Sequence, residues 1–498
     1  MTLRSSILLH LLPLLLLASS GGAMFFYPTP QASLLEHLLV DHGGARAANF
    51  SAAVTPLHQL RDRGRRAWLR VAFHDFITAD TTAAAGGGVT TGGIDASIGF
   101  ETGRAENKGS AFNDSLTFWR PFVNEYVSMS DLIALGTVMS VHLCGGKAIP
   151  YRPGRVDALH ADPTTGVPEP ETGVDETLDE FGRAGFNKQD AIALTACGHT
   201  LGSVHHGGFP EVVGPEAVTP NNTNGGANFD STRGAFDPLV VHEYIDATGS
   251  RGGALVTSFN ETARSDLRLY ESDGNRTMRG LYNMTAEAFQ DTCAGLLGRM
   301  IDTVPSGVRL GDVIAPMSIK PVNVTWDFDG ATGGLVLSGN IRSGKGHTAY
   351  GDSDTYFYPF AIPGSAIADA TSFTVAGDSL TAQTFPITRQ GQPFLVPRMS
   401  TATGSSTSFT VASAADSGLE EGMTVEVTAP VEQPLTLAPK VVTAVVNLTM
   451  TEDVKPGFRF WKGSYDVHQQ VTGAIGLTLT QGGEALDHLL LGAGLAGW

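Results

Sequence analysis

The sequence predicts a mainly α-helical N-terminal half followed by an all-β, sandwich-like C-terminal half. From about Gln31 to Met300 the apolar residues recur mostly with the spacing of amphipathic helices. Beyond Val304 the pattern changes, and from Val322 to Phe328 apolar and polar residues alternate as in a half-buried strand. A chain of 498 residues is also too long for one ordinary core. We therefore predict a helical domain at 24–304, a linker at 305–318 and a β-rich domain at 319–498.

Start and stop signals locate several helices in the first half. Ser128 followed by Asp131 resembles a capping box before an apolar run, and Gly145 closes that run. Asn187 with Asp190 opens another helix. The predicted helical ranges are about 56–76, 132–143, 191–196 and 285–301.

The second half consists of short β-rich runs, at 408–412, 423–429 and 441–450. Clusters of Gly, Ser, Pro and Asp separate these runs, as in a small antiparallel sandwich. The sequence shows no convincing repeat there and no motif that assigns a role. The half could contact a cell wall or polysaccharide, or simply cover the first domain.

The first 23 residues are organised like a secretory signal peptide, with Arg4, an apolar run from Ile7 to Ala18 and small residues up to Ala23. No later stretch has the roughly 20 uninterrupted apolar residues of a membrane span. The apolar end from Leu489 to Trp498 leaves a lipid-anchor signal as an alternative. We expect a secreted, extracellular glycoprotein. Eight Asn-x-Ser/Thr sequons support this expectation, at Asn49, Asn113, Asn221, Asn260, Asn275, Asn283, Asn323 and Asn447.

Charge and cysteine content narrow the classes of partner and fold. The net charge of −18 argues against nucleic acid or an anionic membrane as partner, because both favour clustered Lys and Arg. The three cysteines, Cys144, Cys197 and Cys293, allow at most one internal disulfide and leave at least one thiol. Disulfides are therefore not expected to be the main support of the fold.

The segment LRVAFHD places Arg70 and His74 four residues apart, so both lie on one face of a helix while Asp75 points elsewhere. A neutral imidazole can take a proton from one peroxide oxygen and return it to the other, and a fixed cation can offset charge on the departing oxygen. This pair therefore suits the cleavage of hydrogen peroxide. Taken alone, the two residues could equally be ordinary surface residues of an amphipathic helix.

LRVAFHD resembles the distal helix of the plant, fungal and bacterial haem peroxidases. The resemblance implies a mainly α haem-peroxidase fold in which two helical subdomains sandwich one haem b. It also implies that Phe73 packs on the haem and that Asp75 is a calcium ligand. The matching strings cover roughly residues 55 to 300, and they are most similar to the secreted fungal peroxidases, in particular those of ascomycetes.

Two further strings resemble the distal side of this family. In GGIDAS, the Gly93 carbonyl, the Asp95 carboxylate and the Ser97 hydroxyl alternate like oxygen ligands of a hard cation, and resemble the distal calcium site that Asp75 completes. Taken alone, GGIDAS could be only a turn. FETGRAENKG resembles the segment in which an Asn accepts the N–H of the distal histidine and a Glu orients that Asn. The resemblance assigns these roles to Asn107 and Glu101.

Three histidines, His199, His205 and His206, follow a predicted helix in DAIALTACGHTLGSVHH, and by composition any of them could bind a metal. ACGHTLG resembles the proximal helix of the same peroxidases, which selects His199 as the haem-iron ligand. RSDLRL resembles their Ser-Asp segment and implies that Asp266 makes this imidazole more electron-rich, although an Asp can also simply begin a helix. Phe229 is implied to pack under the haem.

NFDSTRGAFDP resembles the second calcium site of the family. The implied ligands are Thr200, Asp230, Thr232, the Ala235 carbonyl and Asp237. A last string, PYRPGRVDA, resembles the segment that lines the haem-access edge and places Arg155 and Asp157 there without a chemical role.

Three departures limit what the resemblance implies. Secreted members usually carry about four disulfides, more than three cysteines can form. Lignin-attacking members place a Trp where this chain has Leu194, and manganese-oxidising members place acidic residues where it has Arg63 and Ala67. Trp68, Trp119 and Tyr126 could relay electrons, although aromatic residues near helices are far more often part of the core.

We therefore predict a haem peroxidase that reduces H2O2 and oxidises small, phenol-like donors, with one haem b and two Ca²⁺ ions. The alternative is a catalytically weak cell-wall or surface interaction protein that uses its β domain. Oxygen insertion or halide oxidation by the same cofactor is not separable by sequence.

Overall fold

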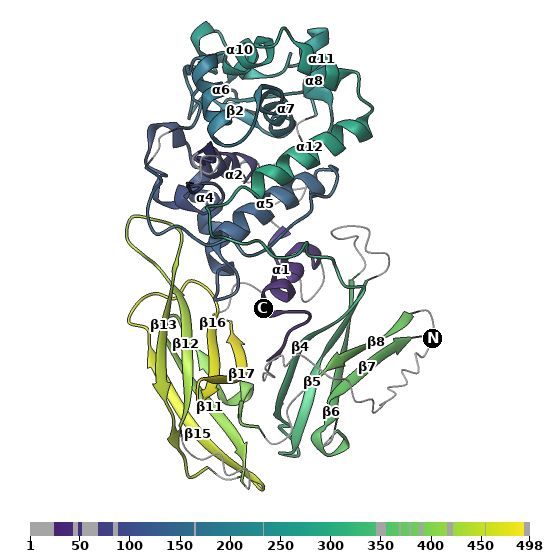
Figure 1. The fold of residues 1–498 in the computed structure, drawn as a ribbon, viewed down its shortest axis with the longest axis vertical. Helices are drawn as coiled ribbons and strands as arrows, with labels where there is room; N and C mark the ends of the chain where they lie inside the picture. Colours follow the sequence, from purple (N-terminus) through teal and green to yellow (C-terminus); the bar gives the residue numbers. More distant parts are fainter. Residues whose placement is uncertain are drawn as a thin grey trace.

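The computed structural model describes residues 24–42, 48–51, 68–82, 88–163, 166–232, 234–344, 355–367, 370–377, 380–387, 392–415, 422–453 and 455–492. The predicted signal peptide, the predicted helix before Trp68 and the last six residues lie outside these ranges. Figure 1 shows a helical half at one end of the molecule and two groups of strands at the other. The predicted division into a mainly α and an all-β half is thereby confirmed.

The helical half has one hydrophobic core, which α12 (Ala286–Ile301) helps to build from both sides. This helix packs against α7 (Lys188–Gly198) on one side, and against α2 (Trp68–Phe76) and α5 (Met129–Leu143) on the other. The remaining helices are α1 (Pro30–Val40), α4 (Ala111–Trp119), α6 (Val174–Arg183), α8 (Leu239–Asp246), α9 (Ala254–Thr257), α10 (Ser265–Glu271) and α11 (Arg276–Tyr282). Two helical groups thus face each other across α12, as the family fold requires.

The two predicted helix starts differ in their caps. Asn187 and Asp190 form the reciprocal capping box that begins α7, with Asp190 N–H donating to Asn187 Oδ1 at 3.0 Å. Ser128 caps α5 through its hydroxyl, which accepts the Asp131 N–H at 3.1 Å. The Asp131 carboxylate instead pairs with the buried Arg155, Oδ1 to Nη1, at 3.0 Å. The predicted box at Ser128 is therefore only half formed.

The β half contains two packed units rather than one sandwich. In one unit β1 (Met24–Phe25), β4 (Ile319–Phe328), β5 (Leu335–Gly344) and β6 (Thr355–Pro363) form an antiparallel sheet, and the hairpin β7–β8 (Ser372–Gly377, Leu380–Pro386) shares its core. In the other, the sheets β10-β11-β15-β14 and β13-β12-β16-β17 enclose a second core. The strands of this sandwich are β9 (Phe394–Leu395), β10 (Thr401–Ala402), β11 (Ser406–Ala414), β12 (Met423–Val431), β13 (Lys440–Asn447), β14 (Thr449–Met450), β15 (Phe458–Asp466), β16 (Ile475–Gln481) and β17 (Glu484–Leu491).

A buried cluster of charges joins the two halves. Glu36 of α1 pairs with Lys320 of β4 at 2.8 Å and with Arg342 of β5, while Asp41 lies 3.4 Å from Arg342. The four side chains are fully buried or nearly so. Burial alone would raise the pKa of Glu36, but the charges of Lys320 and Arg342 hold that pKa below its ordinary value. In addition β1, from the first half, pairs with β4, so the start of the helical half is built into the β half.

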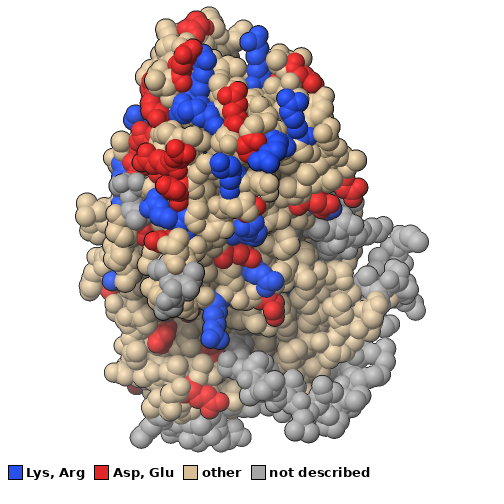
Figure 2. Space-filling model, turned by 45° about the horizontal axis from the view of Figure 1, so that its top comes forward, with Lys and Arg blue, Asp and Glu red and all other residues tan. Residues whose placement is uncertain are grey.

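Charged side chains of both signs are mixed over the visible face of the molecule. Figure 2 shows Lys and Arg interspersed with Asp and Glu rather than gathered into a basic field. None of the helices in the described part of the chain is long and apolar enough to cross a membrane.

Candidate active site

One cavity of about 860 Å³ brings the predicted distal and proximal residues together. Arg70 and His74 line it from α2, and His199 lines it from the end of α7. Such a volume lies within the range of about 300–1,000 Å³ typical of ligand pockets. Much of the wall is apolar, formed by Leu69, Phe73, Phe181, Leu194, Leu201, Phe229, Leu269, Leu297 and Met300, among others.

His74 is buried and held as one tautomer. Its Nδ1 lies 2.7 Å from Asn107 Oδ1, and Asn107 Nδ2 donates to the Glu101 backbone carbonyl at 2.9 Å. Because a carbonyl only accepts, the amide nitrogen of Asn107 faces Glu101 and its oxygen faces His74. The proton is therefore on Nδ1, which leaves the lone pair on Nε2. Burial and the Arg70 charge lower the pKa of His74 well below its ordinary value, so the ring is a neutral base.

Glu101 orients Asn107 through its backbone carbonyl and not through its side chain. Its backbone oxygen holds Asn107, while its carboxylate accepts the Asp162 N–H at 2.8 Å and pairs with Arg104 at 3.0 Å. The contact between Glu101 and Asn107 is thus made by the backbone of residue 101. The carboxylate itself braces the loop rather than the amide.

Arg70 is fixed as a partly buried cation. Its guanidinium donates to the carbonyls of Lys108 at 3.0 Å and Glu106 at 3.2 Å, and its Cζ lies 4.7 Å from the Phe112 ring centroid. Phe209 contributes a second ring at 5.2 Å. Burial lowers the pKa of Arg70 to about 10, so the side chain is still charged at neutral pH. Neither phenylalanine belongs to a string that sequence reasoning singled out.

On the proximal side, His199 follows the last residue of α7. Its Nδ1 lies 2.6 Å from Asp266 Oδ2, and its ring stacks on Phe229 with centroids 4.0 Å apart and planes 5° apart. A proton on Nδ1, shared with the carboxylate, leaves Nε2 available to a metal and makes the imidazole a more electron-rich ligand. His206 contacts the Val213 carbonyl instead, at 2.7 Å, and His205 lies near Ser203. Nδ1 of His199 is thus held by a carboxylate, whereas Nδ1 of His206 is held by a backbone carbonyl.

These features fit a haem. His74 and His199 face the cavity from opposite sides, and the Asp266 carboxylate backs His199. Phe73 and Phe229 also line this cavity, whose walls are largely apolar. An Nε2 free to ligate iron on one side and a base with a fixed cation on the other is the donor set that peroxide chemistry at a haem needs.

The expected distal calcium ligands converge. Asp75 accepts the N–H groups of Asp95 at 3.1 Å, Ala96 at 2.9 Å and Ile98 at 3.1 Å. The Ser97 hydroxyl lies 3.5 Å from Asp75 Oδ1 and 3.4 Å from Asp162, a carboxylate that no motif pointed to. Gly93 lies in the same loop, with φ at 101°.

The buried carboxylates of this distal group, Asp75, Asp95 and Asp162, repel one another. Burial and the neighbouring Asp162 charge raise the pKa of Asp95 to about 7, and burial and Asp95 raise the pKa of Asp75 well above its ordinary value. A cation would relieve that repulsion. Within the described ranges, however, no set of three or more His, Cys, Asp or Glu side chains is arranged as a ready metal site.

Four expected ligands of the second calcium site, Asp230, Thr232, Ala235 and Asp237, also lie together. Asp230 Oδ1 accepts the Thr232 N–H at 2.9 Å, and the Thr232 hydroxyl lies 3.2 Å from Asp237 Oδ1. Ala235 closes the same turn through its N–H to the Thr232 carbonyl at 3.0 Å. Asp230 Oδ2 is buried without a hydrogen-bond partner among the described residues, and burial and Asp237 raise the pKa of Asp230 to about 7. The Thr200 hydroxyl points to the Cys197 carbonyl at 3.1 Å.

Two expectations for the cavity edge are wrong. Arg155 is buried between Asp131 and the Ile301 carbonyl, at 3.0 Å and 2.7 Å, and Asp157 accepts the first N–H groups of α5. Neither residue lines the cavity. Both satisfy helix ends, which a local string does not distinguish from an exposed edge.

The aromatic residues considered as electron relays pack in or beside the core. Trp68 and Trp119 are buried with ring centroids 5.2 Å apart, and Tyr126 is half-buried. The core interpretation of the tryptophans is therefore confirmed.

Comparison with known proteins agrees with this geometry. A family model described as Peroxidase matches residues 50–286. The chain is 37% identical over 323 residues to a WSC domain-containing protein of Arthroderma benhamiae, covering 63% of this chain and 43% of that protein. It is 37% identical over 99 residues to cytosolic L-ascorbate peroxidase 2 of Arabidopsis thaliana, covering 20% and 39%, and 34% identical over 176 residues to manganese peroxidase 3 of Phlebia radiata, covering 34% and 44%. The chain thus spans less than half the length of each of these relatives.

A helical domain that sets a His–Arg pair opposite a carboxylate-backed histidine has the side chains that peroxidase chemistry needs. The helical half of this chain accordingly belongs to the haem peroxidase superfamily.

Proposed function

We propose that this protein is a haem peroxidase that reduces H2O2 to water while two small, phenol-like donors each lose one electron. The observation that carries the proposal is the pairing of Arg70 and His74 with His199 and Asp266 across one cavity. The peroxidase names of several relatives support the general activity, although the chain matches only part of each.

Haem b, ligated by His199, would supply the iron that accepts electrons from the donors and passes them to peroxide. His74 would take a proton from one peroxide oxygen through Nε2 and return it to the other, so that the second oxygen leaves as water. Arg70 would stabilise the charge on the departing oxygen. Asn107 would keep the His74 lone pair on Nε2, and Asp266 would keep His199 electron-rich and correctly oriented.

The reducing donor is proposed to be a small phenol. The apolar lining of the cavity favours such a ring, and Leu194 stands where lignin-attacking relatives carry an oxidisable Trp. The manganese-site positions Arg63 and Ala67 lie outside the described residues, but neither side chain is a carboxylate.

Two Ca²⁺ ions would complete the cofactors. The orphaned Asp230 Oδ2 supports the proximal ion, and the repulsion among Asp75, Asp95 and Asp162 supports the distal ion. We propose a secreted glycoprotein because of the signal-like start and the sequons. Its β half would contact cell-wall polysaccharide; a catalytically weak wall protein is disfavoured by the complete set of catalytic side chains.

The test is to load the full chain with haem, record its absorption spectrum, and follow the spectral change after one equivalent of H2O2. His74→Leu should slow that reaction by about 10²–10⁴-fold, the usual contribution of a positioned base. Retained haem in the variant would show that the proximal side is intact. Unchanged peroxide reactivity in His74→Leu would refute the assigned role.

A further inference from the structure

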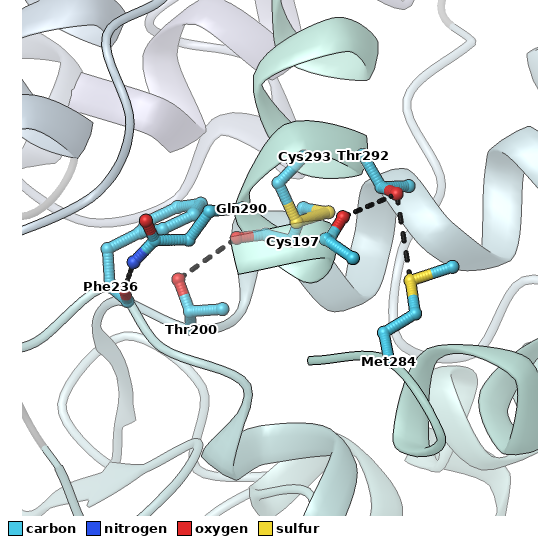
Figure 3. The surroundings of a disulfide bond; sticks show 8 residues. Cys197, Thr200, Phe236, Met284, Gln290, Thr292 and Cys293 are labelled. Atoms are coloured by element: carbon cyan, nitrogen blue, oxygen red, sulfur yellow. Dashed lines mark hydrogen bonds between the residues drawn. A yellow bond between two sulfur atoms is a disulfide. The ribbon is translucent and has the colours of Figure 1, made fainter. Parts of the chain in front are cut away.

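A disulfide joins Cys197 and Cys293 (Figure 3), and Cys197 precedes the iron-ligand candidate His199 by two residues in the sequence. Cys197 is in the last turn of α7, two residues before His199, and Cys293 is in the middle of α12. Both side chains are fully buried. Nothing in the proposed reaction uses this bond.

The disulfide closes a loop of the chain that contains proximal residues of the cavity. The cysteines are 96 residues apart in sequence, and His199, Phe229 and Asp266 all lie between them. The residues that hold the proximal imidazole are therefore contained in one covalently closed loop.

The α12 end of the bond is itself well fixed. Gln290, one turn before Cys293, donates to the carbonyls of Phe236 and Gly145, both at 3.2 Å. One turn beyond Cys293, Leu297 is buried and lines the cavity, and Met300 does so further on. α12 also contacts α2, which carries Arg70 and His74. The disulfide therefore attaches the proximal side of the cavity to the same helix that the distal side packs against.

At its other end, the disulfide holds the last turn of α7. His199 lies just beyond the helix, where terminal turns fray, and its N–H bonds to Thr195 at 2.9 Å. The Thr200 hydroxyl contacts the Cys197 carbonyl from the other side. Covalent attachment at Cys197 limits how far this last turn can move.

We propose that the Cys197–Cys293 disulfide is a positioning device for the iron ligand: it holds the end of α7 on α12 and thereby keeps His199 seated under the haem. Reduction of the bond would loosen the proximal ligand while leaving the distal pair in place. This inference rests on the proposed function only in that haem binds through His199.

The experiment compares the wild-type chain with Cys197→Ala/Cys293→Ala, and uses Glu36→Gln as a control that destabilises the molecule far from the cavity. The first readout is the rate at which haem passes to excess apomyoglobin. The double variant should lose haem at least about tenfold faster, as expected when support behind a ligand is removed, and its Soret band should report altered coordination. Glu36→Gln should lower the melting temperature without changing the rate of haem loss.

The second readout needs no haem. In the apoproteins, hydrogen exchange at residues 195–200 should accelerate in the double variant and not in Glu36→Gln, while exchange in α2 stays as in the wild type. If the double variant does not fold, the wild-type holoprotein is treated with a phosphine until two further thiols titrate, and haem loss is followed before and after reoxidation.

The proposal would be overturned if the double variant matched Glu36→Gln in haem retention and in hydrogen exchange. It would also be overturned if the reduced wild-type protein kept haem as tightly as the oxidised protein. Failure of the wild-type chain to bind haem at all would instead count against the proposed function.

Discussion

The two walls of the cavity are supported in different ways. On the distal wall, His74 is held by a short chain of neutral hydrogen bonds through Asn107 to the Glu101 carbonyl. On the proximal wall, His199 is held by a charged partner 67 residues away and by a disulfide that closes a 96-residue span. A base must exchange protons in each cycle, so it suits neutral contacts, whereas a metal ligand must keep its place. The comparison predicts that proximal changes affect haem retention and distal changes affect peroxide reactivity.

The largest effect on the cavity is expected from Asp266→Asn. An amide of the same shape cannot supply the negative charge opposite His199 Nδ1, so the ligand becomes less electron-rich and is no longer held in one tautomer. Haem retention should fall by about 10–100-fold. The control is Asp246→Asn, which removes a carboxylate on α8 that accepts the Tyr282 hydroxyl at 3.1 Å. Equal haem loss in both variants would show that Asp266 has no special role.

A smaller effect, confined to peroxide reactivity, is expected from Asn107→Ala. Without an acceptor at Nδ1, the His74 ring can take the other tautomer, and the rate constant for the reaction with H2O2 should fall by about tenfold. Haem retention should be unchanged.

Glu101→Gln separates the two possible ways of orienting Asn107. The backbone carbonyl of residue 101 is retained in this variant, so its peroxide rate should stay close to the wild-type rate. A loss as large as that in Asn107→Ala would mean that the carboxylate, and not the carbonyl, holds the amide.

The sequence predicts those parts of this site that are set by local spacing. Arg70 and His74 lie on one turn of helix, and His199 follows a capped helix, so each is visible in a short string. The partners that the structure adds come from distant segments: Asp162 reaches the Asp75 loop, and Phe209 reaches Arg70. Their positions depend on how segments pack, and no local pattern encodes that packing.

Arg155 illustrates the opposite error. Its string resembles a segment at the cavity edge, yet the side chain is buried as a helix-end partner of Asp131 and the Ile301 carbonyl. In the same way, the division at residues 305–318 gave no sign that β1 pairs with β4, or that Glu36 and Lys320 meet across 284 residues. The long-range contacts that unite the halves are the part of the fold that composition and periodicity leave out.

The smallest effect on the cavity, and a large one on stability, is expected from Glu36→Gln. Among the described residues, loss of this charge leaves Lys320 and Arg342 buried with Asp41 as their acidic partner, and breaking a buried pair typically costs about 3–5 kcal/mol. Chemical denaturation at neutral pH, monitored by helix and strand signals together, would measure the loss.

The pH dependence gives the sharper test of this cluster. In the folded chain the pKa of Glu36 lies below its ordinary value of 4.5, since Lys320 and Arg342 outweigh burial. Its contribution to the free energy of unfolding is therefore fully present above pH 4.5 and is lost as pH falls through the folded pKa. Wild type should lose stability in that acid range more steeply than Glu36→Gln, so the two should converge, while both retain haem equally at neutral pH. Parallel acid profiles would show that Glu36 is not the titrating link between the halves, and faster haem loss in Glu36→Gln would show that the β half supports the proximal wall directly.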